Sequence, residues 1–179
     1  GIIIINGPTG SGKSTTLYSI LKEIKDDEIN ITTLEDPIEV QIEGVNQMSL
    51  NRKANITFAN GLRNILRQDP DVIMIGEIRD EDTAKAAIQA SLTGHLVVST
   101  IHAKDGLGAL YRLMDLGISI DELKQTVTGV VTQRLVSVVK TKSPELSAIY
   151  EIIADDVLED ALLSISEGNT FKVPVPLTL

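Results

Sequence analysis

Residues 1–14 read GIIIINGPTGSGKS, a β-branched run followed by a glycine-rich segment and a lysine. The run Ile2–Ile5 is continuously apolar, which is typical of a strand buried on both faces of a parallel sheet. The segment Gly7–Ser14 matches G-x-x-x-x-G-K-[ST], the phosphate-binding loop, and residues 14–24 continue with apolar side chains at helical spacing. The loop is therefore expected between a strand and a helix, as its mechanism requires.

This loop predicts the binding of a nucleoside triphosphate. Its glycines let successive N–H groups turn toward phosphate oxygens, and the following helix N-terminus favours an anion. Lys13 can reach the β- and γ-phosphates, and the Ser14 hydroxyl can ligate Mg²⁺. A chance match is expected in under about one chain in a hundred of this length. The predicted nucleotide-binding residues are Gly7, Pro8, Thr9, Gly10, Ser11, Gly12, Lys13, Ser14 and Thr15.

Strand and helix patterns alternate through the rest of the chain. Predicted strands cover residues 1–6, 29–34, 45–50, 72–75, 96–100 and 148–153, and predicted helices cover 14–24, 57–68, 80–92, 107–116, 119–139 and 157–165. Such alternation indicates an α/β domain with a mainly parallel sheet flanked by helices. We expect a core over residues 1–140, and over residues 141–179 a C-terminal extension of the same domain with a poorly ordered tail at Pro174 and Pro176.

Composition narrows the functional classes. The 179 residues carry 16 basic and 25 acidic side chains, for a net charge of −9, and only 3% are aromatic. An acidic, aromatic-poor chain is a poor match for a protein that mainly grips nucleic acid. Cysteine is absent, which excludes disulfides, cysteine-ligated zinc and thiol catalysis. No apolar run approaches the ~20 residues of a membrane helix.

Carboxylates follow two of the predicted strands. Glu77 comes after Val72–Ile75 and Gly76, and Glu35 directly follows the predicted strand 29–34. In a parallel sheet both strand ends open onto the edge that carries the phosphate loop, where one carboxylate can hold the metal and another can orient water. The alternative for each is a solvated acidic residue. Glu77 is the stronger candidate because its strand is more apolar.

The two histidines flank the predicted strand 96–100. His102 follows its C-terminal end, where an imidazole can contact a γ-phosphate, although a surface histidine is an equal alternative on this pattern alone. His95 precedes the strand and is expected to lie away from the nucleotide. Because two histidines and no cysteines make no metal cluster, the expected ion is Mg²⁺, held by Ser14 and carboxylates.

The chain resembles the secretion ATPases that drive type II secretion, type IV pili and DNA uptake. The resemblance covers about residues 1–155. It is carried by the phosphate loop Gly7–Ser14, the acidic segment Thr33–Glu39, the segment Leu66–Asp80 with Gly76-Glu77 in place of Asp-Glu, the histidine segment Thr93–Ala103, Tyr111–Leu113 and Gln133–Leu135.

The resemblance implies a RecA-like C-terminal ATPase domain that works as a ring-shaped homo-hexamer on the cytoplasmic face of the cell membrane. It implies a polytopic membrane platform protein as partner, with pilin-like subunits moved indirectly. By the same resemblance, Glu35 is the general base, Glu77 is tied to Mg²⁺ and His102 senses the γ-phosphate. The expected activity is Mg²⁺-dependent ATP hydrolysis, with Lys13, Glu35, Glu77 and His102 as catalytic residues.

Two departures from the family pattern refine these expectations. Many relatives insert a four-cysteine zinc module after the region of Gln133–Leu135, and its absence predicts no zinc and favours the late-competence branch, which serves DNA uptake. The family's N-terminal domain does not precede Gly1, so we expect a segment of a longer protein. The alternatives are a RecA-like translocase acting directly on DNA, a non-hydrolysing scaffold and a small-molecule kinase; the kinase leaves the acidic and histidine segments unexplained.

Overall fold

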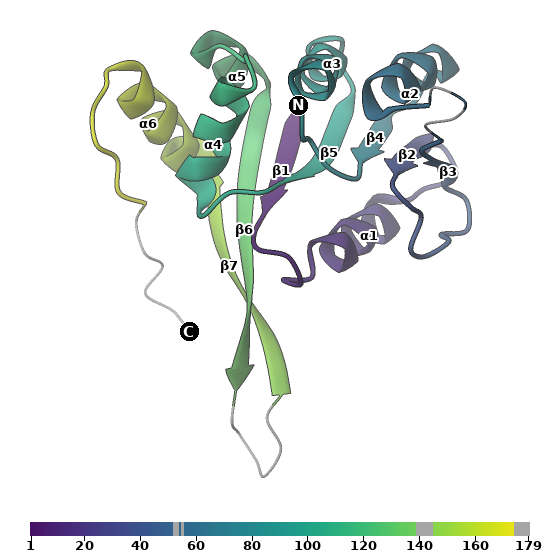
Figure 1. The fold of residues 1–179 in the computed structure, drawn as a ribbon, viewed down its shortest axis with the longest axis horizontal. Coiled ribbons are helices and arrows are strands. Elements are labelled where there is room, and N and C mark those ends of the chain that lie inside the picture. The colour runs from purple at the N-terminus through teal and green to yellow at the C-terminus, as the bar shows by residue number, and fades with distance from the viewer. Residues whose placement is uncertain (52–53, 55, 139–144, 174–179) are drawn as a thin grey trace.

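The computed structural model describes residues 1–51, 54, 56–138 and 145–173. It contains a seven-stranded sheet of order β3-β2-β4-β5-β1-β6-β7 with helices packed against it (Figure 1). Every pairing from β3 to β6 is parallel, and β7 runs antiparallel to β6. The predicted α/β architecture with a mainly parallel sheet is confirmed.

The strands are β1 Ile2–Asn6, β2 Ile31–Glu35, β3 Asn46–Ser49, β4 Val72–Ile75, β5 Leu96–Ile101, β6 Val127–Val138 and β7 Glu145–Ala154. The helices are α1 Lys13–Ile24, α2 Phe58–Ile65 with the 3₁₀ turn Leu66–Gln68, α3 Glu81–Leu92, α4 Gly106–Asp115, α5 Ile120–Thr126 and α6 Asp155–Ser166. Side chains cap two of these helices: Thr57 accepts from the Asn60 N–H and Asp80 accepts from the Thr83 N–H. The predicted tail at Pro174 and Pro176 lies outside the described residues.

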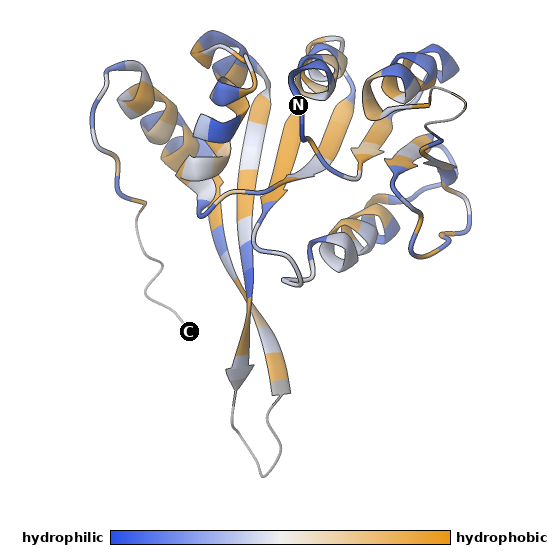
Figure 2. Ribbon diagram, viewed as in Figure 1, coloured by the Kyte–Doolittle hydropathy of each residue, from blue (hydrophilic) through white to orange (hydrophobic). Residues whose placement is uncertain are grey.

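The central strands are apolar on both faces because helices pack against both. Ile2 and Ile4 belong to a cluster that also contains apolar side chains of α2 to α6, whereas Ile5 packs with Leu17 and Leu21 of α1. Successive strand residues point to opposite faces, so a continuous apolar run fills both cores. Figure 2 shows this as apolar colour along most of β1 and along the first part of β5.

The predicted helix over residues 119–139 is only partly correct. Ser119 caps α5 in a reciprocal capping box with Glu122, but the helix ends at Thr126 and the chain continues as β6. β6 is rich in valine and threonine, which lose side-chain freedom in a helix and fit a pleated strand. Pairing with β1 on one side and β7 on the other satisfies its backbone groups.

The parallel strands all end at the same edge of the sheet. β1 begins at the top of Figure 1 and runs downward, so the loop that leads into α1 lies at the lower edge. The ends of β2, β4 and β5 reach the same edge because they run parallel to β1. Below it, β6 and β7 continue as a two-stranded arm (Figure 1). No helix of the described chain is long and apolar enough to span a bilayer.

Candidate nucleotide site

A cleft of about 520 Å³ opens at the edge where the parallel strands end. Four predicted functional side chains from separate segments line it: Lys13, Glu35, Glu77 and His102. Thr9, Gly10, Gly12, Ser14 and Thr15 of the predicted loop also line the cleft, together with Tyr18, Met74, Arg79 and Thr100. His95 lies at the other end of β5, where its ring contacts the Ala90 carbonyl at 2.9 Å.

The loop after β1 has the backbone that a phosphate site needs. Gly10 and Gly12 have φ of 79° and 87°, the left-handed region that glycine enters without strain. Gly12 directly precedes α1, so the helix N-terminus opens into the cleft. Lys13 Nζ donates to the carbonyls of Gly7 at 2.8 Å and Pro8 at 3.0 Å. The ammonium is thus held at the mouth of the loop.

Two side chains of this loop, Lys13 and Ser11, are partly or fully buried. Partial burial lowers the pKa of the Lys13 ammonium, and the negative charge of Glu77 opposes that shift. Ser11 Oγ is buried without a hydrogen-bond partner in the described part of the chain. Ser11 is not among the residues that line the cleft, so this hydroxyl is not placed to receive a phosphate group.

Glu35 is a buried carboxylate, with 3% of its surface exposed. Its Oε2 accepts the Tyr18 hydroxyl of α1, and its Oε1 accepts Thr33 Oγ1 at 2.5 Å and Gln47 Nε2 at 3.0 Å. Burial and the hydrogen bond to Glu35 raise the pKa of Tyr18, so the phenol stays a donor. Three donors therefore fix the orientation of this carboxylate at the cleft wall.

Glu77 is held in a different way. Its Oε2 pairs with Arg79 Nε and lies 3.9 Å from His102 Nε2. Ser14 and Glu77 offer oxygen ligands in the same cleft, and no group of three or more His, Cys, Asp or Glu side chains in the described residues is arranged to hold a metal. Mg²⁺ usually takes one or two protein oxygens and completes its shell with water and phosphate oxygens. Ser14 and Glu77 fit that ion.

Sequence reasoning missed the polar residues that hold the site together. Asn6, fully buried at the end of β1, donates from Nδ2 to the Asp105 carbonyl and accepts the Ala103 N–H, both at 2.8 Å. These bonds fix the loop that carries His102. A polar residue ending an otherwise apolar strand was the available signal. Tyr18 gave a weaker signal in the sequence, because it lies among apolar residues of a helical face.

The profile of the family described as "Type II/IV secretion system protein" matches residues 1–165. The chain belongs to this family. Its sequence is 59% identical over 174 residues to the type II secretion system protein E of Dickeya dadantii, covering 97% of this chain and 34% of that protein. It is 55% identical over 136 residues to the type IV pilus assembly ATPase TfpB of Acinetobacter baylyi, covering 76% of this chain and 23% of that protein.

Solved structures of two ATP-related proteins, a pilus retraction motor and an ATPase, have the same fold. The pilus retraction motor PilT with bound ADP superposes with a TM-score of 0.80 at 32% identity, over 95% of this chain and 54% of that chain. The Legionella pneumophila ATPase DotB superposes with a TM-score of 0.76 at 34% identity, over 92% of this chain and 48% of that one. The RecA-like P-loop fold is therefore shown. This chain spans only about a third or less of the length of these two relatives and about half of the length of the two solved structures.

Proposed function

We propose that this chain is the ATP-hydrolysing motor domain of a type II secretion or type IV pilus-like machine. The observation that carries the proposal is the convergence of Lys13, Glu35, Glu77 and His102, from four separate segments, on one cleft. A phosphate loop alone suits many nucleotide-binding proteins. Two carboxylates and an imidazole beside it supply what hydrolysis needs in addition to binding.

Each residue has a distinct task in this proposal. Lys13 and the N–H groups of the loop bind the β- and γ-phosphates. Ser14 and Glu77 would hold Mg²⁺, which neutralises phosphate charge when bound. Glu35, fixed by its three donors, orients the attacking water and accepts its proton. His102 contacts the γ-phosphate from the end of β5.

The family supports a wider setting for this domain. We infer a homo-hexamer in the intact protein, a polytopic membrane platform protein as partner, and a cytoplasmic position on the inner face of the membrane. The relatives named for type II secretion and type IV pilus assembly support this setting. Deleting the gene should abolish secretion or piliation, and restored secretion by wild-type but not Lys13→Ala protein would tie that loss to the cleft.

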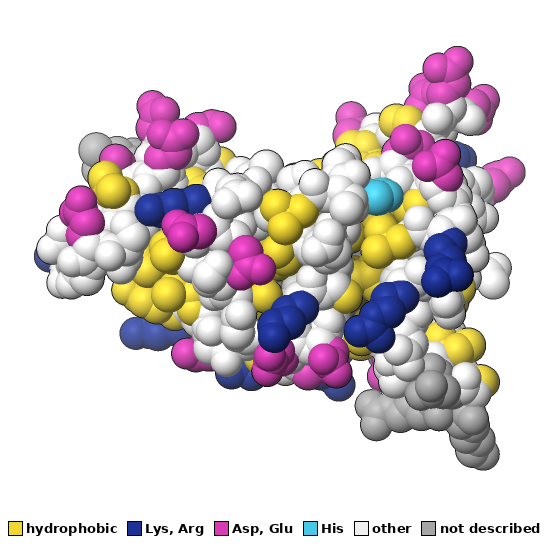
Figure 3. All heavy atoms as spheres, turned by 90° about the horizontal axis from the view of Figure 1, so that it is seen from above, with side chains coloured by type: hydrophobic (Ala, Val, Ile, Leu, Met, Phe, Trp, Pro, Cys, Tyr) yellow, Lys and Arg dark blue, Asp and Glu magenta, His cyan; other side chains and the backbone are white. Residues whose placement is uncertain are grey.

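A role in DNA uptake stays a prediction that the same deletion strain tests through natural transformation. Direct nucleic-acid binding is not expected. The net charge is −9, and on the face shown in Figure 3 separate Lys and Arg side chains lie among acidic and apolar ones. Salt-sensitive binding of single-stranded DNA by the purified protein would favour a DNA translocase instead.

His102→Ala should lower ATP turnover by about 10-fold, the loss expected for one hydrogen bond to a charged phosphate. His95→Ala is the matched control, because it removes the other imidazole from the opposite end of β5 and should leave turnover near wild type. The measurement is steady-state phosphate release at saturating ATP. Equal effects of the two substitutions would remove His102 from the proposed site.

A further inference from the structure

Gln133 of β6 lies against the phosphate loop, although 122 residues separate it from Ser11 in the sequence. Gln133 is buried, with 3% of its surface exposed. Its Nε2 donates to the Ser11 carbonyl at 2.7 Å, and its Oε1 accepts the Thr16 hydroxyl at 2.7 Å. One carboxamide therefore joins the phosphate loop to the first turn of α1.

The two glycines that bracket the loop also touch Gln133. A Cβ on Gly7 would clash with the Gln133 carbonyl oxygen, and a Cβ on Gly12 would lie 2.9 Å from Gln133 Nε2. Their small size thus lets β6 approach the loop closely, besides permitting their positive φ. The loop is packed onto Gln133 at both ends.

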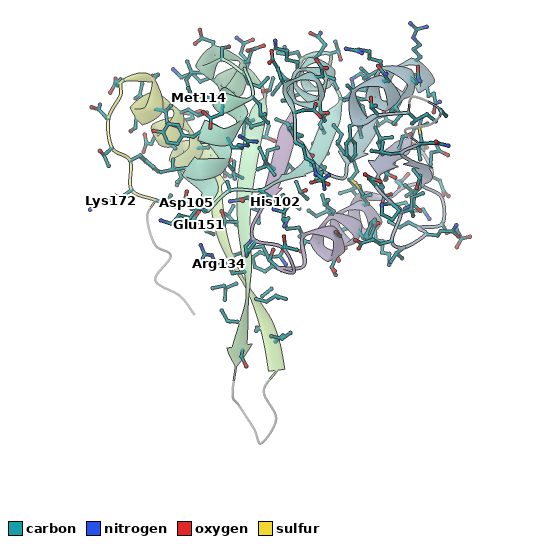
Figure 4. All side chains as sticks on the ribbon, viewed as in Figure 1. His102, Asp105, Met114, Arg134, Glu151 and Lys172 are labelled. Carbon is teal, nitrogen blue, oxygen red and sulfur yellow. The ribbon has the colours of Figure 1, made fainter. Side chains whose placement is uncertain are left out.

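The residues on either side of Gln133 hold the neighbouring loop. Thr132 donates to Glu151 Oε1 at 3.2 Å, and that carboxylate accepts the Gly106 N–H at 3.0 Å. Arg134 Nη2 donates to the Lys104 carbonyl at 3.0 Å. Side chains alternate along a strand, so Gln133 faces α1 while its neighbours face the loop after β5. Figure 4 shows Arg134 and Glu151 beside the loop that carries His102 and Asp105.

We propose that Gln133 is a positioning residue that holds the phosphate loop in its anion-binding shape. The inference rests on the proposed nucleotide site. A loop held in shape before binding does not lose that conformational freedom when phosphate arrives, so its affinity is higher. Removing the carboxamide deletes the bonds at both ends of the bridge, loosens residues 9–13 and weakens nucleotide binding.

The deciding variant is Gln133→Met, which keeps the length and burial of the side chain and loses both hydrogen bonds. Two measurements are made on the purified protein: amide hydrogen exchange of residues 9–13 without nucleotide, and affinity for ADP. We expect exchange in the loop to rise by about 10-fold and affinity to fall by about 10- to 30-fold, the loss expected for two hydrogen bonds.

Gln133→Glu and Thr16→Val extend the test. The glutamate keeps an acceptor for Thr16 but loses the donor to Ser11 and adds a negative charge beside the phosphates, so its affinity should fall further. Thr16→Val removes one of the two bonds with little change in shape and should cost about 3- to 5-fold. Combined with Gln133→Met it should add nothing more, because the two residues share that bond. If Gln133→Met does not fold, the single variants Gln133→Glu and Thr16→Val still test the proposal.

Leu135→Ala is the control, since Leu135 lies on the same face of β6 two residues further along and is 39% exposed. It should leave both measurements at wild-type values. A wild-type exchange rate and affinity in Gln133→Met, or full additivity with Thr16→Val, would overturn the positioning role. A wild-type protein that binds no ADP would overturn the proposed function instead. Amide hydrogen exchange of residues 9–13 would still test the role of Gln133 in that case.

Discussion

Lys13→Ala is expected to abolish detectable ATP turnover and to weaken nucleotide binding by at least about 100-fold. In the proposed site the ammonium that this substitution removes makes charge-assisted bonds to the β- and γ-phosphates, and a loss of about 3 kcal/mol corresponds to a 100-fold change in affinity. The side chain is already placed at the mouth of the loop by the carbonyls of Gly7 and Pro8. The measurements are phosphate release and titration with a fluorescent ADP analogue.

Lys22→Ala is the matched control for this prediction, because Lys22 is exposed in the last turn of the same helix. It removes one positive charge from the chain without touching the cleft. Wild-type turnover in Lys13→Ala, or equal losses in both variants, would contradict the assignment of the phosphate loop.

Glu35→Gln should reduce turnover by about 10²- to 10⁴-fold, the range expected for loss of a general base. Nucleotide affinity should stay within about 3-fold of wild type, because the proposed role of Glu35 is toward water rather than phosphate. The amide also presents an N–H to a site where Tyr18, Thr33 and Gln47 all donate. Stability is therefore measured in parallel by thermal unfolding.

Glu77→Gln should behave differently from Glu35→Gln. The amide is a poorer Mg²⁺ ligand than a carboxylate, so the Mg²⁺ concentration for half-maximal turnover should rise by about 10-fold or more. High Mg²⁺ should partly restore turnover in this variant and not in Glu35→Gln. Glu43→Gln, an exposed carboxylate between β2 and β3, is the control. An identical Mg²⁺ dependence for both cleft variants would contradict the separation of roles.

Local patterns predicted most of the fold. The strand, loop and helix over residues 1–24 could be predicted because each carries its own signal: an apolar run, a glycine-rich turn and helical spacing. β6 could not be predicted, since Val127–Val138 directly follows a well-capped helix. These residues form a strand because they pair with β1 and β7 on either side. Tertiary pairing outweighed the local pattern there.

In the candidate site, too, some residues could be predicted from the sequence and others could not. Lys13, Glu35, Glu77 and His102 could be predicted because each follows a predicted parallel strand, and parallel strands end together. The residues that hold them could not. Gln47 reaches Glu35 from a neighbouring strand, and Gln133 reaches Ser11 across 122 residues of sequence. Such contacts arise only when the sheet is assembled, so no spacing in the sequence reveals them.

The most direct test of the proposed catalytic cleft is a crystal structure of the protein with Mg²⁺ and a non-hydrolysable ATP analogue. The β- and γ-phosphates are expected within hydrogen-bond distance of Lys13 Nζ, with Mg²⁺ on Ser14 Oγ and Glu77, and with Glu35 and His102 facing the γ-phosphate. A nucleotide bound outside this cleft, or a γ-phosphate turned away from both Glu35 and Glu77, would contradict hydrolysis at this site.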